Sequence, residues 1–481
     1  MPNEVELKFD LERGDVALVR EAPVLASARS EAREHETVYF DTARHTLRQA
    51  GYSLRIRRTG DRFVQALKHR NGGSVGLFVR GEWETEIPDL APNLEAIKAG
   101  IAKRLATRIG SDPLLPLIRT RFSRIRWIVD YRGSRIEIVL DEGRVSGGEA
   151  EAPICEVEME LVRGRPKSLF SLAEEIGASV PLRLGVLSKG ERGYALVEHV
   201  LGKAAGAQPL RLGAELESRA AFQIVAIACL RHFRLNEIAL LSGERDVDAL
   251  HQARVALRRL RTAFDLFHPI LAGKEYRHLR DELRWFAAQL GAARDLDVLI
   301  AAAERPSQAL KRRRDKAYEK VEAALRTPRC RSLLLRLASW IQGGVWRFRD
   351  GAAAPLGPLG RHQLDRLWRK VERRGTRIGS LDPDSRHRLR LDAKKLRYSA
   401  EFLSGLSPGR PVRPRRDRFI AALKGLQERL GEINDAGLDL PEAQSAKGSK
   451  GNSGSAPPDS MIVAAQEAYD RAVEPAGYWR G

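Results

Sequence analysis

The sequence is poor in cysteine and in long apolar runs. Its three cysteines (Cys155, Cys229 and Cys330) are widely spaced among 481 residues, which excludes a disulfide framework and a metal site built from paired cysteines. The longest apolar stretch, near residues 220–230, is too short to span a bilayer. Residues 1–20 lack the apolar segment behind a basic start that marks a signal peptide. We therefore expect a cytoplasmic protein.

Acidic residues are scarce relative to basic ones, with 63 Asp and Glu against 83 Lys and Arg and a formal charge of +20. Residues 1–205 carry 32 basic and 30 acidic residues, a balance of +2, whereas residues 206–481 carry 51 and 33, a balance of +18. A strongly basic half attracts polyanions, which include nucleic acid, anionic membranes and inorganic polyphosphate. The length predicts roughly two to four domains.

Short segments of strict alternation fill the N-terminal half. In residues 4–8, Glu-Val-Glu-Leu-Lys, a strand would place Glu4, Glu6 and Lys8 on one face. Two carboxylates and an ammonium on one face suit a site for a divalent cation and a phosphate group. Four later segments show the same alternation and are bounded by turn-forming residues, so we predict that they are also strands. They are Leu54–Arg57, Trp83–Ile87, Ile136–Asp141 and Glu156–Leu161.

One face of these strands is dense in both glutamate and arginine, and two structures would explain it. The first is a solvated sheet face with cross-strand ion pairs, each worth about 0.2–1 kcal/mol. The second is a closed barrel with a polar lumen and an apolar face turned outward under helices. Glu156, Glu158 and Glu160 favour the barrel, because close carboxylates repel by up to about 4 kcal/mol per pair at an effective dielectric of about 20 and need cations.

The residues and their order resemble the CYTH family of triphosphate tunnel metalloenzymes, which includes inorganic triphosphatases, thiamine triphosphatases and some adenylyl cyclases. The resemblance covers residues 1 to about 200. It implies an eight-stranded antiparallel tunnel with surrounding helices and a metal-dependent hydrolysis of inorganic triphosphate to pyrophosphate and phosphate. The motifs that carry it are Glu4–Lys8, Tyr39-Phe40-Asp41-Thr42, Leu54–Arg57, Glu156–Glu160 and Ser188-Lys189-Gly190.

The resemblance also assigns roles to individual residues. The implied ligands of Mg²⁺ or Mn²⁺ are Glu4, Glu6, Glu158 and Glu160, with Asp141 and Glu156 as supporting acids. The implied triphosphate-binding residues are Lys8, Arg55, Arg57, Lys68, Arg119, Arg121 and Lys189. The implied catalytic set is Glu4, Glu6, Lys8, Glu158 and Glu160. Arg124 and Arg126 have the opposite parity to Arg119 and Arg121, so a bulge would exchange the two pairs.

Helical periodicity replaces alternation after the small-residue segment 202–208, and it contains an internal repeat. Residues 251–261 match residues 387–397 at an offset of 136, and Leu290-Gly291 recurs as Leu430-Gly431. A duplication of this length predicts two similar helical bundles. At about 100° per residue, each motif helix carries a basic stripe beside an apolar one. The basic stripes consist of His251, Arg254, Arg258 and Arg261 in the first copy and of His387, Arg390, Lys394 and Arg397 in the second.

The repeat resembles the CHAD domain, a conserved-histidine α-helical domain often found after a CYTH domain. The resemblance covers residues 212–480 and rests on the paired His-x-x-Arg helices and on residues 290–297. It implies two four-helix bundles around a basic channel that binds inorganic polyphosphate through the two stripes. The second copy departs from the pattern at residues 430–438, where no arginine precedes Asp435. Residues 441–458 are rich in Gly, Ser, Pro and Lys and predict a flexible loop.

Together these features predict an α+β protein with a tunnel domain at 1–202, a linker at 203–211 and a helical domain at 212–480. Its partners would be inorganic triphosphate and polyphosphate. We expect it to associate with polyphosphate granules. No membrane binding is expected. Sequence-specific nucleic-acid binding is not expected either, because the basic helices lack recognition-helix polar residues and interleaved aromatic residues.

Two alternatives stay open. One is a non-catalytic scaffold that binds polyphosphate. The other is an enzyme of nucleotides, either a nucleoside or thiamine triphosphatase or an adenylyl cyclase. Carboxylates at both ends of the tunnel sequence favour an enzyme over a scaffold, because binding a polyanion requires bases and not acids. A nucleotide enzyme would require an adenine pocket, which the sequence does not reveal.

Overall fold

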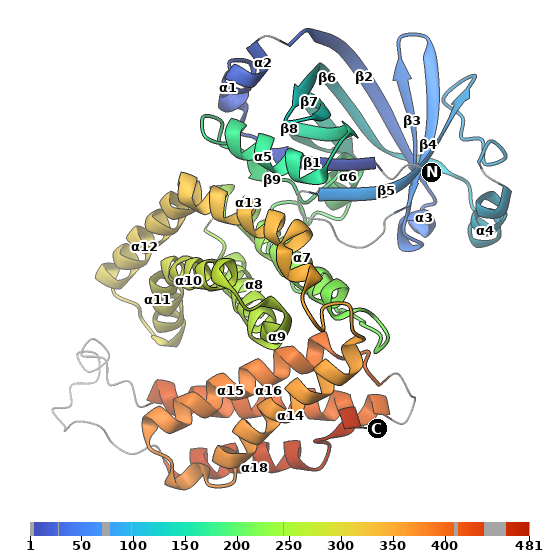
Figure 1. Cartoon of the computed structure of the whole chain (residues 1–481). Helices are drawn as coiled ribbons and strands as arrows, with labels where there is room; N and C mark the ends of the chain where they lie inside the picture. The colour runs from blue at the N-terminus through green and yellow to red at the C-terminus, as the bar shows by residue number, and fades with distance from the viewer. Residues whose placement is uncertain are drawn as a thin grey trace.

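The structure is a computed structural model that describes residues 4–26, 28–69, 77–97, 99–243, 245–407, 412–436 and 458–480. Its N-terminal part is a sheet with helices around it, and the rest is helical (Figure 1). The sheet-containing part lies at one end, a first group of helices follows, and a second group lies at the far end (Figure 1). The predicted α+β architecture is therefore confirmed.

Nine strands form one antiparallel sheet in the order β5-β4-β3-β2-β6-β7-β8-β1-β9. Because β1 also pairs with β5, the first eight strands close into a barrel, and the short β9 is added beside β1. The predicted eight-stranded tunnel is thus present, with one additional two-residue strand. The strands are β1 (Glu4–Asp10), β2 (Ser30–Asp41), β3 (Tyr52–Thr59), β4 (Arg62–His69), β5 (Leu77–Ile87), β6 (Leu115–Tyr131), β7 (Ser134–Gly147), β8 (Ala150–Arg163) and β9 (Arg183–Leu184).

The alternation of the strands sorts side chains between the lumen and the outside of the barrel. Leu54 and Ile56 of β3 pack outside against α3 and α4, whereas Arg55 and Arg57 face the lumen. On the other wall, apolar residues of β1 and β8 pack under α5. The helices of this part are α1 (Val16–Arg20), α2 (Pro23–Ala26), α3 (Thr46–Gln49), α4 (Ala99–Ile109), α5 (Pro166–Ile176) and α6 (Lys189–Val197).

Asp41, at the end of β2, is a fully buried carboxylate that organises the turn into α3. It accepts hydrogen bonds from the backbone N–H groups of Thr42, Leu47 and Arg48, and from the hydroxyl of Tyr194 on α6, at 2.8–3.0 Å. Four donors satisfy a carboxylate that water cannot reach. The Tyr-Phe-Asp-Thr motif therefore joins β2, α3 and α6.

The helical part begins with α7 and consists of two groups. The first group comprises α7 (Ser218–Leu241), α8 (Val247–Leu266), α9 (His268–Leu271), α10 (Lys274–Gln289), α11 (Gly291–Ala302), α12 (Gln308–Arg326) and α13 (Pro328–Gly343). The second group comprises α14 (Leu356–Gly375), α15 (Pro383–Phe402), α16 (Val412–Ala436) and α18 (Asp459–Val473). The first group therefore adds shorter helices to the expected bundle, and the second has four described helices.

The two parts of the chain are packed together. Buried apolar residues of the barrel and of both helical groups belong to one continuous cluster, and α13 contacts α5 and β9. Apart from Pro458, the predicted loop at 441–458 lies outside the described residues. Among the helices that are described, none has an apolar stretch long enough to cross a membrane.

We expect Asp41→Ala to lower the free energy of unfolding by about 3 kcal/mol, because it leaves several buried N–H groups without an acceptor. Urea denaturation would measure the loss. Asp112→Ala is the matched control, since Asp112 only meets the exposed Arg44 at the surface, and should change stability by less than about 1 kcal/mol. Equal effects of the two substitutions would contradict this role of Asp41.

Candidate functional site

The lumen of the barrel holds a cavity of about 580 Å³. It contains seven basic and six acidic side chains, so its charges nearly balance. The basic residues are Lys8, Arg48, Arg55, Arg57, Lys68, Arg124 and Lys189. The acidic residues are Glu6, Glu84, Glu137, Glu158, Glu160 and Glu191. The cavity thus brings together eight of the residues singled out in the sequence, namely Glu6, Lys8, Arg55, Arg57, Lys68, Glu158, Glu160 and Lys189.

The strand register explains why the acids gather. Glu6 of β1 lies opposite Glu160 of β8, and Glu160 lies opposite Glu137 of β7. Lys8 lies opposite Glu158 in the same way. Opposite residues of an antiparallel pair share a face, with Cβ atoms about 4.5–5.5 Å apart. Three carboxylates therefore form a row across β1, β8 and β7, which we call the acidic row (Glu6, Glu137 and Glu160).

The basic residues of β3 and β4 lie across the lumen from this acidic row. In the closed order of the eight strands, β3 is diametrically opposite β8 and β4 is opposite β7. Arg55 and Arg57 of β3 and Lys68 of β4 all line the cavity. We call these three residues the basic wall. The acidic row and the basic wall therefore face each other across the lumen, although Lys8, Arg124 and Lys189 lie among the carboxylates and Glu84 lies beside Arg57.

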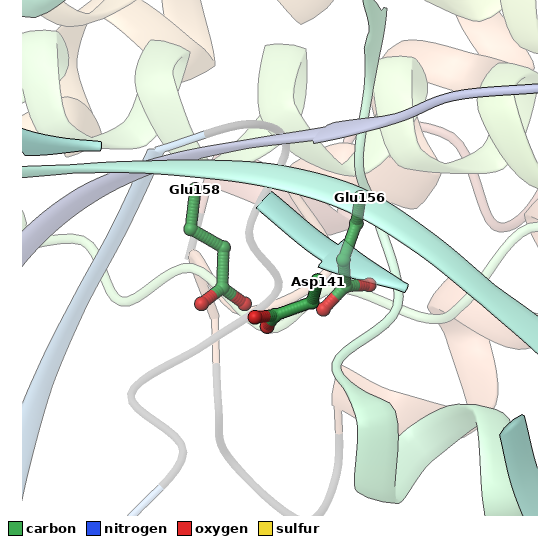
Figure 2. Close-up of side chains that lie close together, drawn as sticks. All are labelled: Asp141, Glu156 and Glu158. Atoms are coloured by element: carbon green, nitrogen blue, oxygen red, sulfur yellow. The ribbon is translucent and has the colours of Figure 1, made fainter. Parts of the chain in front are cut away.

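A second group of acids lies deeper. Oxygen atoms of Asp141, Glu156 and Glu158 all fall within 4.8 Å of one another, so the group could hold a metal ion. The three carboxylates point toward one another in Figure 2. The side chains of Asp141 and Glu156 are fully buried, while that of Glu158 reaches the cavity. We call these residues the buried triad.

Three cations already compensate the buried triad. The ammonium of Lys8 lies 2.6 Å from Glu156 and 3.3 Å from Glu158. The ammonium of Lys189 lies 2.6 Å from Asp141 and also pairs with the other two acids. The guanidinium of Arg124 donates two hydrogen bonds to Asp141, at 2.6 and 2.7 Å. Buried charges persist when they are paired in this way.

The pKa values follow from these pairs. Burial alone would raise the pKa of Glu158, but the charges of Lys189 and two neighbouring cations outweigh burial and hold that pKa well below 4.5. The pKa of Asp141 is lowered below 3.8 for the same reason. The pKa of Lys189 is raised above 10.5, because the surrounding carboxylates outweigh the effect of burial. All three groups are therefore charged at neutral pH.

The Ser188-Lys189-Gly190 motif positions Lys189 beside the buried triad. Ser188 caps α6, and its side chain and that of Glu191 form a reciprocal capping box. Lys189 is the first residue of the helix and is buried. A side chain at Gly190 would place its Cβ 2.9 Å from the ring of Tyr39, so only glycine allows this close approach. The cap and the glycine together fix the direction of Lys189.

The expected positions of Arg119 and Arg121 must be corrected. Both lie on the outer face of β6, are 49% and 69% exposed, and pair with Glu36. The opposite parity faces the lumen, where Arg124 lines the cavity and Arg126 pairs with Glu137 at 2.6 Å. The reason is the β6–β7 register, in which Arg124 lies opposite the inward-facing Asp141.

Several lining residues were not predicted from the sequence. Glu137 had a signal, since it shares the strand parity of Asp141. Arg48 had none, because it reaches the cavity from α3, where its guanidinium stacks on Tyr194 at 4.6 Å. Glu84 of β5, which lies in the predicted strand Trp83–Ile87, pairs with Arg57 at 2.9 Å. Only the folded barrel determines the position of α3, from which Arg48 reaches the cavity.

The acidic row and the buried triad both offer carboxylate oxygens to a divalent cation, and those of the triad lie within 4.8 Å of one another. Carboxylate oxygens are the ligands that Mg²⁺ and Mn²⁺ prefer. Directly opposed like charges destabilise a sheet, and a cation beside Glu6 and Glu160 would relieve this repulsion. The triad already has three cations, so the expected supporting acids Asp141 and Glu156 hold Lys8 and Lys189. The backbone of Glu4 continues β1, but its side chain lies outside the described structure.

The predicted basic stripes lie on α8 and α15, which contact each other. Lys395 of α15 lies 2.8 Å from Asp265 of α8, and Arg259 of α8 pairs with Glu401. The two copies also share a packing detail. Cβ atoms added at Gly291 and Gly431 would lie 3.3 and 3.1 Å from the guanidinium groups of Arg254 and Arg390 respectively. Each glycine thus makes room for the arginine of a His-x-x-Arg motif.

Cations crowd around the first stripe. Burial, followed by the charges of Arg294 and Arg258, lowers the pKa of His251. Burial and the same two arginines lower the pKa of Arg254 against the opposing effect of Asp295. Burial also lowers the pKa of Arg261 against the opposing effect of Asp265, and Arg284 and Arg280 of α10 lower it further together with Arg258. An anion bound here would relieve the repulsion. In the second stripe His387 is exposed, while Arg390, Lys394 and Arg397 are half-buried.

Comparison with known proteins gives separate matches for the barrel and for the helical part of the chain. A CYTH domain model matches residues 2–194, and a CHAD domain model matches residues 224–440. An inorganic triphosphatase from Haemophilus influenzae is 30% identical over 158 residues, or 33% of this chain and 44% of that protein, so the match spans less than half of its length. An uncharacterised protein from Mycobacterium tuberculosis is 26% identical over 458 residues and 82% of each chain. The crystal structure of the CHAD domain from Ricinus communis covers 57% of this chain and 93% of its own, with 28% identity and a TM-score of 0.45.

We expect the protein to lose stability as the pH falls below about 5, because Glu158 and Asp141 have folded-state pKa values below their unfolded ones and must take up protons. The stability that depends on their charge is fully present at a pH above the pKa of the unfolded state. It is lost as the pH falls through the pKa of the folded state. Urea denaturation between pH 7 and pH 3 would follow it. Glu158→Gln should flatten the dependence, whereas Glu36→Gln on the outer face should leave it unchanged. Identical pH profiles for all three proteins would contradict the assignment.

Proposed function

Because the chain consists of a CYTH domain followed by a CHAD domain, we propose that its tunnel hydrolyses inorganic triphosphate to pyrophosphate and phosphate. The observation that carries this proposal is that the basic wall of β3 and β4 faces the acidic row across the cavity. A linear triphosphate would lie between them, with the arginines and the lysine binding its oxygens and the carboxylates holding its metal. The volume suits a small ligand.

The side chains would divide the work of binding. Arg55, Arg57 and Lys68 would bind the phosphate oxygens, and guanidinium groups are well matched to them. Lys8 and Lys189 would meet the chain from the side of the buried triad, which fixes their ammonium groups in advance. Such preorganised charge is a main source of rate enhancement in phosphoryl transfer.

Mg²⁺ or Mn²⁺ would be held by Glu6 and Glu160 together with Glu158, while Glu4 lies on the same strand. When bound, the metal would supply charge neutralisation and water activation. A pure polyphosphate scaffold would have no need of this row of acids. Charged side chains make up 13 of the 24 residues that line the cavity, which suits a chain of phosphates. The lining also includes Tyr39, Tyr52, Phe122 and Tyr194, so the comparison of substrates below decides between inorganic triphosphate and a nucleotide.

We expect Glu6→Ala and Glu160→Ala each to lower the rate of tripolyphosphate hydrolysis by about a hundredfold or more, since each removes charge that holds the metal. Phosphate release would be measured with Mg²⁺, with Mn²⁺ and with a chelator. Glu36→Ala removes a carboxylate from the outer face of the same barrel and should retain the wild-type rate.

The same assay compares substrates. Tripolyphosphate, ATP and long-chain polyphosphate would be supplied to the wild-type protein, and cyclic AMP would be monitored with ATP. Preference for tripolyphosphate would support the proposal. An absence of tripolyphosphate hydrolysis with every divalent metal would refute it, and a preference for ATP would point to nucleotide chemistry.

The helical part, by the same proposal, binds inorganic polyphosphate along α8 and α15. The support is the cluster of arginines around Arg258, in which burial and mutual repulsion lower pKa values. Phosphate chains would neutralise this cluster without requiring any sequence of bases. Arg280 and Arg284 of α10 and Arg294 of α11 extend the surface beyond the two predicted stripes.

We expect the combined substitution of Arg258, Arg261, Lys394 and Arg397 by alanine to weaken polyphosphate binding at least about a hundredfold, because each lost cation removes a phosphate contact. Filter binding or calorimetry at physiological salt would measure it. The matched control replaces four cations of α12 (Lys311, Arg312, Arg313 and Lys316) and changes the net charge equally. Equal losses of polyphosphate affinity in the two variants, or equal competition by duplex DNA, would show that binding depends only on non-specific charge.

A further inference from the structure

Two arginines of the helical part contact the N-terminal part of the chain at one end of β1. Arg231 and Arg234 lie three residues apart on α7 and therefore share one face of that helix. Arg234 is 1% exposed, and Arg231 is mostly covered. Neither residue belongs to the basic stripes, and both donate hydrogen bonds to the N-terminal part of the chain.

Their target is the segment of residues 183–188, which contains β9 and leads directly into α6. The Nε of Arg234 donates to the carbonyl of Leu184 at 2.8 Å, and Arg231 donates to the carbonyl of Val186. Between these two residues, the N–H of Gly185 donates to the carbonyl of Lys8 at 2.8 Å. The segment is therefore held by α7 on one side and by β1 on the other.

The close approach to Lys8 depends on glycine. A Cβ at residue 185 would lie 2.7 Å from Cγ of Lys8. The segment thus contacts one lysine of the buried network directly, and it leads within three residues to the other, Lys189. Its position bears on both ammonium groups that compensate the buried triad.

Arg231 also contacts the helix cap behind Lys189. Its second guanidinium nitrogen lies 3.1 Å from one carboxylate oxygen of Glu191. The other oxygen of Glu191 accepts from the backbone N–H of Ser188 at 2.9 Å and so completes the capping box. A single guanidinium therefore binds one residue on each side of Lys189, namely Val186 and Glu191.

A parallel contact secures the end of β1. Arg192 of α6 lies 3.0 Å from one oxygen of Asp10, and Arg234 lies 3.4 Å from the other. Glu237 of α7 completes this group by pairing with Arg234 and, at 3.1 Å, with Arg183. The ends of β1, β9 and α6 thus meet on one face of α7.

We infer that Arg231 and Arg234 are positioning residues for the tunnel site, so that α7 of the helical part holds Lys8 and Lys189 in their working geometry. The expected effect on the KM for tripolyphosphate rests on the proposed function. It assigns the helical part a role in the tunnel reaction that is separate from polyphosphate binding. Arg231 makes no contact with the substrate in this view and acts through the 183–188 segment and Glu191.

We expect Arg231→Ala to raise the KM for tripolyphosphate about tenfold with a smaller change in kcat, because a displaced Lys189 weakens phosphate binding. Arg231→Lys should recover part of the loss, since one ammonium retains the charge but reaches Glu191 and Val186 less well than a fork of donors. Full-length protein would be used throughout, and thermal unfolding would verify that each variant is folded. If Arg231→Ala does not fold, Arg231→Lys alone carries the comparison with wild type.

The matched control is Arg326→Ala. Arg326 is also an arginine of the helical part that pairs with the N-terminal part, through Glu12, but it lies outside the 183–188 segment. Its removal should leave KM and kcat unchanged. A second readout is amide hydrogen exchange, which should increase at residues 185–191 in Arg231→Ala and not in Arg326→Ala.

These measurements separate the inference from the proposed function. Wild-type turnover with an unchanged KM in folded Arg231 variants would overturn the inference and leave the function standing. A wild type without turnover would overturn the function, and calorimetric binding of tripolyphosphate would then decide the inference. Weaker binding by Arg231→Ala than by Arg326→Ala supports it, and equal binding overturns it.

Discussion

Inside the closed barrel every charge must find a partner of opposite sign, and this requirement governs the N-terminal half. Removing one partner from a buried pair costs about 3–5 kcal/mol, so Asp141, Glu156 and Glu158 cannot be separated from the cations that face them. The barrel supplies Lys8 and Arg124 from its own strands. Lys189 comes from α6 instead, which makes the cap of that helix as important to the lumen as any strand.

Much of the barrel could be predicted from the sequence, because a period of two and a helix-covered outer face decide which side chains turn inward. Glu6, Lys8, Arg55 and Arg57 follow this rule. Arg119 and Arg121 do not, because β6 carries arginines on both faces; the apolar residues that mark the outer face of this strand, Trp127 and Val129, lie further along it. The sequence also identified Asp141 and Glu156 as acids near a metal, yet only the folded contacts show that lysines occupy them.

The helical half shows the same division between pattern and context. A repeated motif predicted α8 and α15 and the arginines along them, because duplication leaves its mark in residue spacing. The glycine beside each motif arginine was visible as part of the repeat, but its purpose became clear only from packing. Arg231 and Arg234 look like ordinary surface charges of an amphipathic helix in the sequence, since what buries them is the other half of the chain.

The closure of the barrel by β1 has a consequence for how the molecule assembles. β1 lies at the beginning of the chain, but it pairs with β8 about 150 residues later and is completed by β9 and α6 after that. Contacts so distant in sequence slow folding, and an unpaired strand edge invites association with other chains in the meantime. During synthesis the first strand therefore waits for most of the N-terminal half to emerge. The tunnel can close only when β1 has paired with β8.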